Sequence, residues 1–261
     1  MRAFLIPAIA AVLTAAVPAG LHADVKNVPY PEVKVKLGTR YQPDAAFEKM
    51  RTALVDATAK KDTTALLRLV GPTFVWTLND ELADKFDFGR DAVHNFKVVF
   101  GFRDYGKDVD GGVEDGPFWD ALASFAADKI YYQATDDGNL ICGPMAAEIV
   151  DDEKFEQAGK KIEAEDDGGA DWYFTIGDVA VTKSPGDTGP PVARLGTVAL
   201  PVLGTSAQSQ DAQPTHLQVL LPSGKTGWIP ASAARPFNSN RLCYAKTANG
   251  DWKVVLFSES E

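Results

Sequence analysis

The hydrophobic pattern of the chain changes near residue 171, and this change limits the folds open to it. Before that point, apolar side chains recur every three or four residues, as on one face of an α-helix. After it, short β-prone runs alternate with turns rich in Gly, Pro, Ser and Asp. The pattern predicts an α+β protein, with a helix-rich part followed by a strand-rich part.

The first 23 residues have the layout of a secretory signal peptide. One Arg precedes an apolar run over 3–17, and a proline and small residues follow before a cleavage point after Ala23 or Ala19. The apolar run is shorter than the roughly 20 residues that span a bilayer, which favours a signal peptide over a membrane anchor. The mature protein is therefore expected to be periplasmic or secreted, with no transmembrane anchor.

The two cysteines, Cys142 and Cys243, are expected to form a disulfide. Cysteines matured in an oxidising compartment are usually paired, and both lie in apolar settings typical of structural thiols. The bridge would close a loop of about 100 residues. The alternative is a nucleophilic Cys142, which needs a basic partner, and only His94 and His216 remain once the signal is removed.

Composition and turn signals divide the mature chain into four parts. Residues 24–42 are rich in proline and are predicted to form an extended leader or linker. Residues 43–170 hold most of the acidity and form the predicted helix-rich domain. Residues 171–236 form a predicted small barrel, and 237–261 a terminal hairpin, in which Asn249-Gly250 predicts a type I′ turn.

Capping residues and apolar spacings predict four helices in the acidic part. Asp44 and Asp62 are the expected N-caps of the first two, and further helical patterns run through 91–100 and 117–127. In the terminal hairpin, alternation predicts that Trp252 shares one face of its strand with the residues two and four positions later.

The formal net charge of −10 argues against a nucleic-acid partner, because binding a phosphate backbone requires clustered Lys and Arg. The many acidic residues could also form a calcium-binding site. Segments 106–117 and 163–174 each match part of an EF-hand loop, but Pro117 and Phe174 replace the closing bidentate ligand. The alternatives left are an irregular calcium site and a solvated acidic surface, and no metal centre or cofactor is assigned.

The run LQVLLPSGKTGWIPAS at 217–232 resembles the signature of bacterial SH3-like (SH3b) domains. Upstream, VAVTKSPGDTGPPVARLG fits the opening strand and Pro-containing loop of that family, so the resemblance covers roughly 175–236. Two departures are Thr182-Lys183, where the family usually has Arg, and His216, where it commonly has an aromatic residue. The resemblance implies an SH3-like barrel, and the layout of the whole chain is similar to exported proteobacterial SH3-domain-containing envelope proteins.

Four residues of this part are candidate binding residues. Trp228 is predicted to line a peptide groove, the alternative being that it packs within the barrel. His216 is either a pH-sensitive contact or an exposed residue at a strand end. Lys225 is most simply a solvated turn residue, and Gly227 lets the backbone pack closely beside Trp228. The expected partner is a peptide, presented by peptidoglycan or by an envelope protein.

No complete catalytic motif is present, so the leading interpretation is a non-catalytic exported binding module of the cell envelope. The opening AFEKMRTALVDATAKKDTTALLRLVGPTFVW also resembles the start of NTF2-like domains. The alternative function is therefore a ligand-binding or enzymatic helical domain with the barrel as an accessory. It requires a pocket lined by Trp76, Phe96, Phe100 and Trp119, containing a buried acid or His94.

Overall fold

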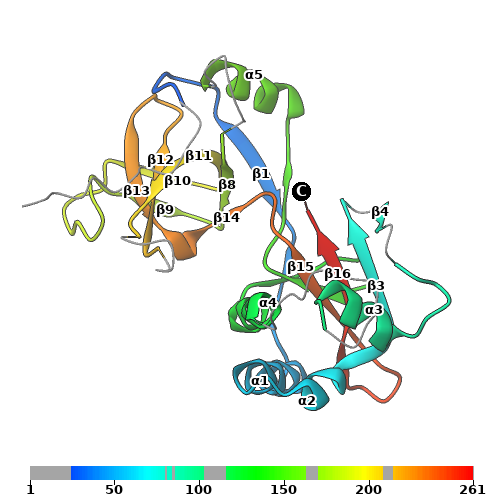
Figure 1. The fold of residues 1–261 in the computed structure, drawn as a ribbon. Helices are drawn as coiled ribbons and strands as arrows, with labels where there is room; N and C mark the ends of the chain where they lie inside the picture. The colour runs from blue at the N-terminus through cyan, green and yellow to red at the C-terminus, as the bar shows by residue number, and fades with distance from the viewer. Residues whose placement is uncertain are drawn as a thin grey trace, which may run out of the picture.

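The computed structural model describes residues 25–79, 81–83, 86–102, 116–162, 170–207 and 214–260 (Figure 1). The predicted signal peptide and most of both EF-hand-like segments lie outside these ranges, including the acids aligned with calcium ligands. In the described part of the chain, no group of three or more metal-ligating side chains occurs. Every helix described is too short or too polar to cross a membrane.

The predicted fold class is wrong. The molecule is β-rich, with 37% strand and 25% helix, so residues 43–170 do not form a helix-rich domain. The strands of the later part form open sheets, and no closed barrel is present among the described residues. The four predicted helices are present, but α5 (Asp152–Ile162) was not predicted. Several short strands between the helices pair with remote segments, and local periodicity does not report such pairing.

One seven-stranded sheet, called the first sheet, combines strands from both ends of the chain. Its members are β2 (Thr39–Tyr41), β3 (Val70–Leu78), β4 (Glu81–Leu82), β5 (Tyr131–Gln133), β6 (Leu140–Gly143), β15 (Arg241–Lys246) and β16 (Trp252–Glu259). The order across the sheet is β2-β5-β6-β15-β16-β3-β4. All neighbours are antiparallel except β16 and β3, which are parallel.

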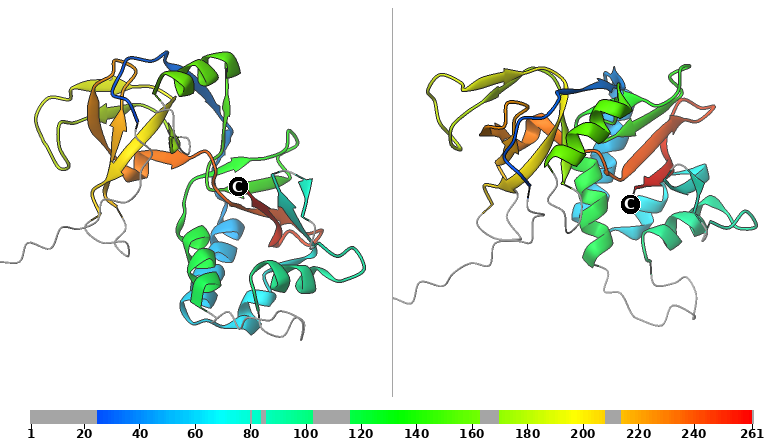
Figure 2. Two further views of the ribbon diagram at one scale, coloured as in Figure 1. Left: turned by 45° about the horizontal axis from the view of Figure 1, so that its top comes forward. Right: turned by 90° about the horizontal axis from the view of Figure 1, so that it is seen from above.

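Four helices lie with the first sheet, and apolar side chains from all four form a core against one of its faces (Figures 1 and 2). They are α1 (Ala45–Ala59), α2 (Thr63–Leu67), α3 (Ala92–Val99) and α4 (Gly116–Ala127). Asp44, Asp62 and Asp91 cap α1, α2 and α3, each accepting a backbone N–H three residues later. The N-caps predicted at Asp44 and Asp62 are thus confirmed.

The terminal hairpin is the centre of the first sheet rather than an appendage. β15 pairs with β6 on one side, and β16 pairs with β3 on the other. The type I′ prediction is wrong, because of the two turn residues only Gly250 has a positive φ, of 85°. A bulge in the pairing changes the phase of β16, so Trp252 and Phe257 face the helix side while Leu256 packs in another core cluster.

The other seven-stranded sheet, called the second sheet, comes mostly from one stretch of chain. Its members are β1 (Val33–Leu37), β7 (Ala147–Ile149), β8 (Trp172–Thr175), β11 (Val198–Thr205), β12 (His216–Leu220), β13 (Thr226–Pro230) and β14 (Ala234–Pro236). The order is β13-β12-β11-β1-β7, with β8 paired to β11 and β14 paired to β8. A 3₁₀ turn, η1 (Ala231–Ala233), connects β13 to β14.

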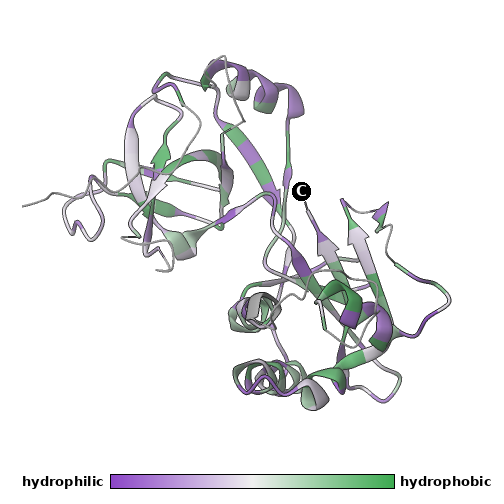
Figure 3. Cartoon of the chain, in the orientation of Figure 1, coloured by the Kyte–Doolittle hydropathy of each residue, from purple (hydrophilic) through white to green (hydrophobic). Residues whose placement is uncertain are grey.

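Two further elements flank the second sheet. The hairpin of β9 (Val179–Val181) and β10 (Ala193–Leu195) lies beside β13 and is joined to it by a bridge from Thr182 to Trp228. Helix α5 (Asp152–Ile162) buries Ala158 and Ile162 while its other residues are largely hydrophilic (Figure 3).

Residues 24–42, predicted as a leader or linker, are extended and contribute strands to both sheets. β1 lies between β11 and β7, and β2 continues into the first sheet beside β5. Gly38 marks the crossing, where a Cβ atom would lie 2.6 Å from the ring of Tyr132. The segment therefore connects the two sheets through paired backbone.

Candidate functional site

The strands β12 and β13 form a regular antiparallel hairpin that separates its side chains onto two faces. Gln218 is opposite Trp228, and His216 is opposite Pro230. Leu217, Val219, Gly227 and Ile229 are buried on the inner face, and the residues between them are half-buried or exposed. Because side chains alternate along a strand, Trp228 lies on the outer face.

Trp228 is half-buried on this face, outside the apolar clusters that fill the cores. Its backbone N–H and C=O exchange hydrogen bonds with those of Thr182, both 2.9 Å long. The Thr182 hydroxyl also donates to the Trp228 carbonyl at 3.3 Å. Both backbone polar groups of Trp228 are therefore bonded to the residue at the end of β9, while the residues beside it in β13 pair with β12 and its ring is half-buried.

Gly227 makes this close approach possible. It is buried, and a Cβ atom at this position would collide with the side chain of Val181 and lie 3.2 Å from the Thr182 carbonyl oxygen. A residue with a side chain would therefore push β9 away from β13. The predicted reason for a glycine beside Trp228, close packing of backbone, agrees with this geometry.

His216 lies at the open end of the hairpin, next to a small polar network. Its backbone N–H donates to the Ser206 hydroxyl at 2.9 Å, and its Nδ1 lies 3.1 Å from the Thr215 hydroxyl. The Ser206 and Thr215 hydroxyls are themselves 3.0 Å apart. His216 is two residues from Gln218, which is opposite Trp228, so His216 and Trp228 are diagonal neighbours on one face.

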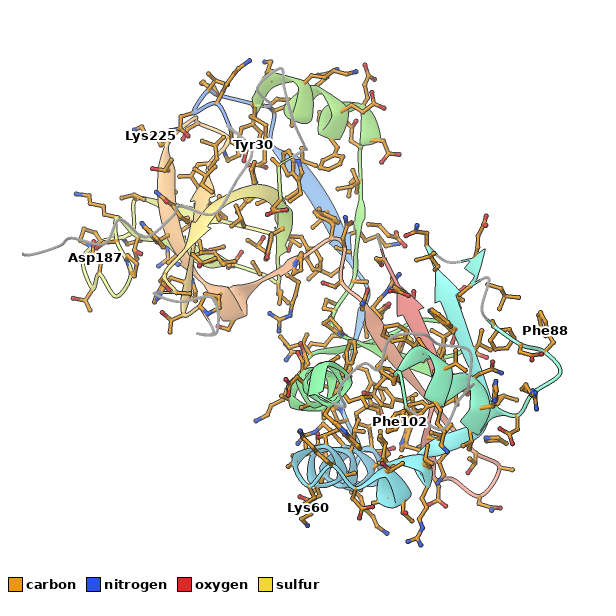
Figure 4. The ribbon with its side chains drawn as sticks, in the orientation of Figure 1. Tyr30, Lys60, Phe88, Phe102, Asp187 and Lys225 are labelled. Atoms are coloured by element: carbon orange, nitrogen blue, oxygen red, sulfur yellow. A yellow bond between two sulfur atoms is a disulfide. The ribbon has the colours of Figure 1, made fainter. Side chains whose placement is uncertain are left out.

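Lys225 is at the opposite end of the hairpin. It is exposed in the turn after β12, where its carbonyl accepts from the Leu221 N–H at 2.8 Å (Figure 4). The turn depends on Gly224, which has a φ of 77° and packs against the backbone of Pro29. The structure thus brings His216, Gly227 and Trp228 together and places Lys225 apart from them.

Sequence reasoning did not select Gln218 and Pro230, although both share the outer face with Trp228 and His216. The sequence did contain a signal for these two residues. The tight turn after β12 fixes the register of β12 against β13, and the alternation of side chains along each strand then shows which residues share a face. The combined face of His216, Gln218, Trp228 and Pro230 is called the Trp228 face below. It offers an aromatic ring, an amide and an imidazole, which suit hydrogen bonding and stacking against a peptide.

The predicted disulfide is present. Cys142 and Cys243 are bonded, and they are directly opposite each other in the adjacent strands β6 and β15. Both are buried, so neither thiol is available as a nucleophile. The chain leaves the first sheet after β6, builds most of the second sheet, and returns at β15. The disulfide therefore joins the two strands from which the second sheet extends.

Three of the four aromatic residues proposed for an enclosed pocket pack against other rings instead, and the Trp76 indole donates to the Glu259 carboxylate at 3.2 Å. Phe96 is fully buried and lies 4.8 Å from Phe100 and 5.3 Å from Phe74 between ring centroids. Trp119 meets Phe102 at 5.5 Å. Two cavities, of about 490 and 400 Å³, occur elsewhere, and neither is lined by any of the four predicted residues or by His94.

The chain matches no protein-family model, no curated protein and no solved structure. The main features of the candidate site are a half-exposed Trp228 with a fixed backbone and a neighbouring imidazole and amide. The resemblance of 175–236 to bacterial SH3-like domains stays a prediction.

Proposed function

We propose that this protein is a non-catalytic binding module of the cell envelope, which recognises a peptide through the Trp228 face. The observation that supports this most directly is the position of Trp228, half-exposed beside His216 and Gln218 on a rigid hairpin. Aromatic side chains of this kind dominate binding energy at recognition surfaces, because they supply contact area at low entropic cost. The partner is a peptide from peptidoglycan or from an envelope protein.

The compartment in this proposal follows from the disulfide and the leader sequence. A buried bridge between Cys142 and Cys243 is typical of proteins that mature outside the reducing cytosol. Residues 1–23 have the pattern of an export signal. Together these features support a periplasmic or secreted protein, and the net charge of −10 disfavours nucleic acid as a partner.

The test is capture of defined partners by the protein from residue 24 onward. We expect purified peptidoglycan fragments, or one envelope protein identified by cross-linking at the Trp228 face, to be retained by the wild type. Trp228→Ala should weaken retention at least about tenfold, as expected for a residue that dominates an interface. Trp76→Ala, the same change at a half-buried tryptophan of the first sheet, is the matched control and should retain the partner.

Two outcomes would contradict the proposal. One is retention of neither peptidoglycan fragments nor a cross-linked envelope protein by the wild type. The other is a partner that binds equally well to the wild type and to Trp228→Ala, with circular dichroism showing that both are folded. The second outcome would place the binding site elsewhere on the molecule.

A further inference from the structure

The smaller of the two cavities, of about 400 Å³, is called the polar cavity below. It lies where the chain passes from β14 of the second sheet to β15 of the first sheet (Figure 1). The end of α4 forms the opposite wall, and Ser124 and Asn238 in the lining are exposed, so the cavity opens to solvent. Its volume is within the roughly 300–1,000 Å³ usual for small-molecule sites.

Hydroxyl and amide groups dominate the described lining of the polar cavity. The polar residues that line it are Ser124, Asp128, Asn238, Ser239, Asn240 and Ser260. Among the described residues, the side chains of Asn238 and Ser124 and the Nδ2 of Asn240 have no hydrogen-bond partner. Each of these groups donates hydrogen bonds, and hydroxyl and amide oxygens also accept them. The cavity therefore offers both donors and acceptors to a ligand.

The single carboxylate of the described lining is already balanced by a cation. Asp128 accepts from the Ile130 N–H at 2.7 Å and from the Arg235 Nη2 at 3.2 Å, and both charged side chains are largely buried. A carboxylate has about four acceptor positions, so Asp128 can still accept from a ligand hydroxyl. No Lys, Arg or His is among the described lining residues, which disfavours a phosphate or carboxylate ligand.

Two hydrogen bonds hold the wall between β14 and β15 in place. The Asn240 Oδ1 accepts from the Ser260 N–H at 3.0 Å, which orients the Asn240 amide and ties down the end of the chain. The Ser239 hydroxyl donates to the Pro236 carbonyl at 2.8 Å. These polar groups are thus positioned before any ligand binds, which reduces the entropic cost of binding.

The remaining lining is apolar and comes from Phe125, Pro144 and Pro236. Phe125 is half-buried, and its ring meets Phe257 edge to face at 5.9 Å between centroids. Of the described lining residues, only Pro236 lies in a strand, and proline has no N–H to donate. This wall therefore cannot pair with an extended peptide backbone in the way that a sheet edge does.

A sugar in the pyranose form fits this combination of groups. When its hydroxyls are equatorial they project from the rim of the ring, and the two faces of the ring present C–H groups. We propose that the polar cavity binds one uncharged pyranose unit, whose hydroxyls bond to Asn238, Asn240 and Asp128 while a C–H face lies against Phe125. The residues of the Trp228 face do not line this cavity, and the proposal does not rest on the function proposed for that face.

The experiment titrates the folded protein with methyl β-D-glucopyranoside, a neutral pyranose with equatorial hydroxyls, followed by NMR chemical shifts. The sugar should bind saturably and perturb the backbone amides of Ser124, Ser239 and Ser260. Cyclohexanol, a six-membered ring with one hydroxyl, should bind at least about tenfold more weakly, since several hydrogen bonds are lost.

A second titration, with cellotetraose, distinguishes the two sources of such a unit. Binding that is tighter than that of the methyl glucoside assigns the cavity to the end of a glycan chain. Equal or weaker binding of the tetrasaccharide assigns it to a free monosaccharide. Either result, with shifts at the same backbone amides, supports the sugar assignment.

Variants test the amide contacts. Asn240→Asp keeps the shape and the acceptor for Ser260, removes the Nδ2 donor and adds a charge, so it should weaken sugar binding by about tenfold. Asn27→Asp makes the same change at an exposed asparagine outside the lining and should bind as the wild type does. If Asn240→Asp does not fold, Asn238→Asp, at an exposed position, should weaken binding several-fold.

Three results of the titrations would overturn the proposal: equal binding of the glucoside and cyclohexanol, no saturable binding of the glucoside, or shifts that map away from the cavity. Wild-type affinity in folded Asn240→Asp and Asn238→Asp would also overturn it. Trp228→Ala should bind the glucoside as the wild type does. Loss of sugar binding in a folded Trp228→Ala would move the site to the Trp228 face and contradict the assignment to the polar cavity.

Discussion

The two sheets use the chain in different ways. In the second sheet, β11, β12 and β13 follow one another in sequence and in space, and β14 returns to β8 within the same stretch. In the first sheet, β3 pairs in parallel with β16, and β6 pairs with β15 across a separation of about 100 residues. The first sheet therefore depends on long-range closure, and the second mainly on local pairing.

The largest expected effect removes the covalent link in the first sheet. Cys142→Ser together with Cys243→Ser should lower the free energy of unfolding by about 4 to 5 kcal/mol in the chain-entropy model, given a separation of 101 residues. Urea denaturation measures this loss. Amide exchange should increase more in β6 and β15 than in β12 and β13. Equal increases in both sheets would remove the contrast drawn between them.

The core beneath the helices provides the second test. Phe47 of α1 is fully buried, and its ring lies within 5.5 Å of the rings of Tyr131, Tyr244 and Trp252. Phe47→Ala should cost about 3 to 5 kcal/mol of stability, because it leaves a cavity that neighbouring rings fill poorly. Phe88→Ala, at a ring that is 80% exposed, is the control and should change stability by less than about 0.5 kcal/mol. Thermal denaturation measures the loss of stability in both variants. Similar losses in Phe47→Ala and Phe88→Ala would contradict the placement of Phe47 in the core.

Gly227 tests the second sheet. Gly227→Ala should destabilise the protein by about 1 to 3 kcal/mol, because the added methyl group collides with Val181. Gly196→Ala, where an added Cβ meets nothing within 4 Å, should be close to neutral. Tryptophan fluorescence should also change in Gly227→Ala, since its backbone adjoins Trp228. A stable Gly227→Ala with unchanged fluorescence would argue against the close approach of β9.

Substitution of Asp44 should cause the smallest loss of stability, and that loss should depend on pH. Its carboxylate accepts from the Phe47 N–H, from Lys246 and from the Trp252 indole. The hydrogen bond from Lys246, followed by the one from Phe47, lowers the pKa of Asp44 below its ordinary value. Asp44→Ala should cost about 1 kcal/mol at neutral pH, the usual value for an N-cap, because the ion pair with Lys246 is largely exposed.

The sign of the pH dependence follows from that lowered pKa. The contribution of the Asp44 charge is complete above the unfolded pKa of about 3.9 and is lost as pH falls through the lower folded pKa. The stability difference between the wild type and Asp44→Asn should therefore shrink below about pH 4. Denaturation of the wild type and of Asp44→Asn at a series of pH values measures this difference in stability. A stability difference that grows in acid would contradict the contacts of Asp44.

Features near in sequence were the ones predicted correctly. Asp44 and Asp62 were placed as N-caps because a capping carboxylate and an apolar face lie within one helical turn. The terminal hairpin was found from Asn249-Gly250 and its alternating flanks, yet its turn type and the phase of β16 were not. A bulge is set by how the strand fits both neighbours, and one of those neighbours, β3, is remote in sequence.

The candidate residues show the same limit. Gly227 and Trp228 were selected from a local motif, and His216 from its alignment with a strand start. Nothing in the local sequence joined Arg241 to Ser258 and Thr77, because these residues meet only when β3, β15 and β16 are side by side. The cavity of about 490 Å³ that these strands line could not be anticipated from any one segment.

Taken alone, the order of residues determined the cysteine pair, the starts of the first two helices and the turn-rich strands, since each depends on a few adjacent side chains or on the pairing expected of two cysteines, and it predicts an export-type leader. The tertiary structure decided which strands became neighbours, which face Trp228 occupies and where the cavity of about 490 Å³ lies. Backbone hydrogen bonds between strands are the same for every residue type, so pairing across long separations is selected by the packing of the whole chain.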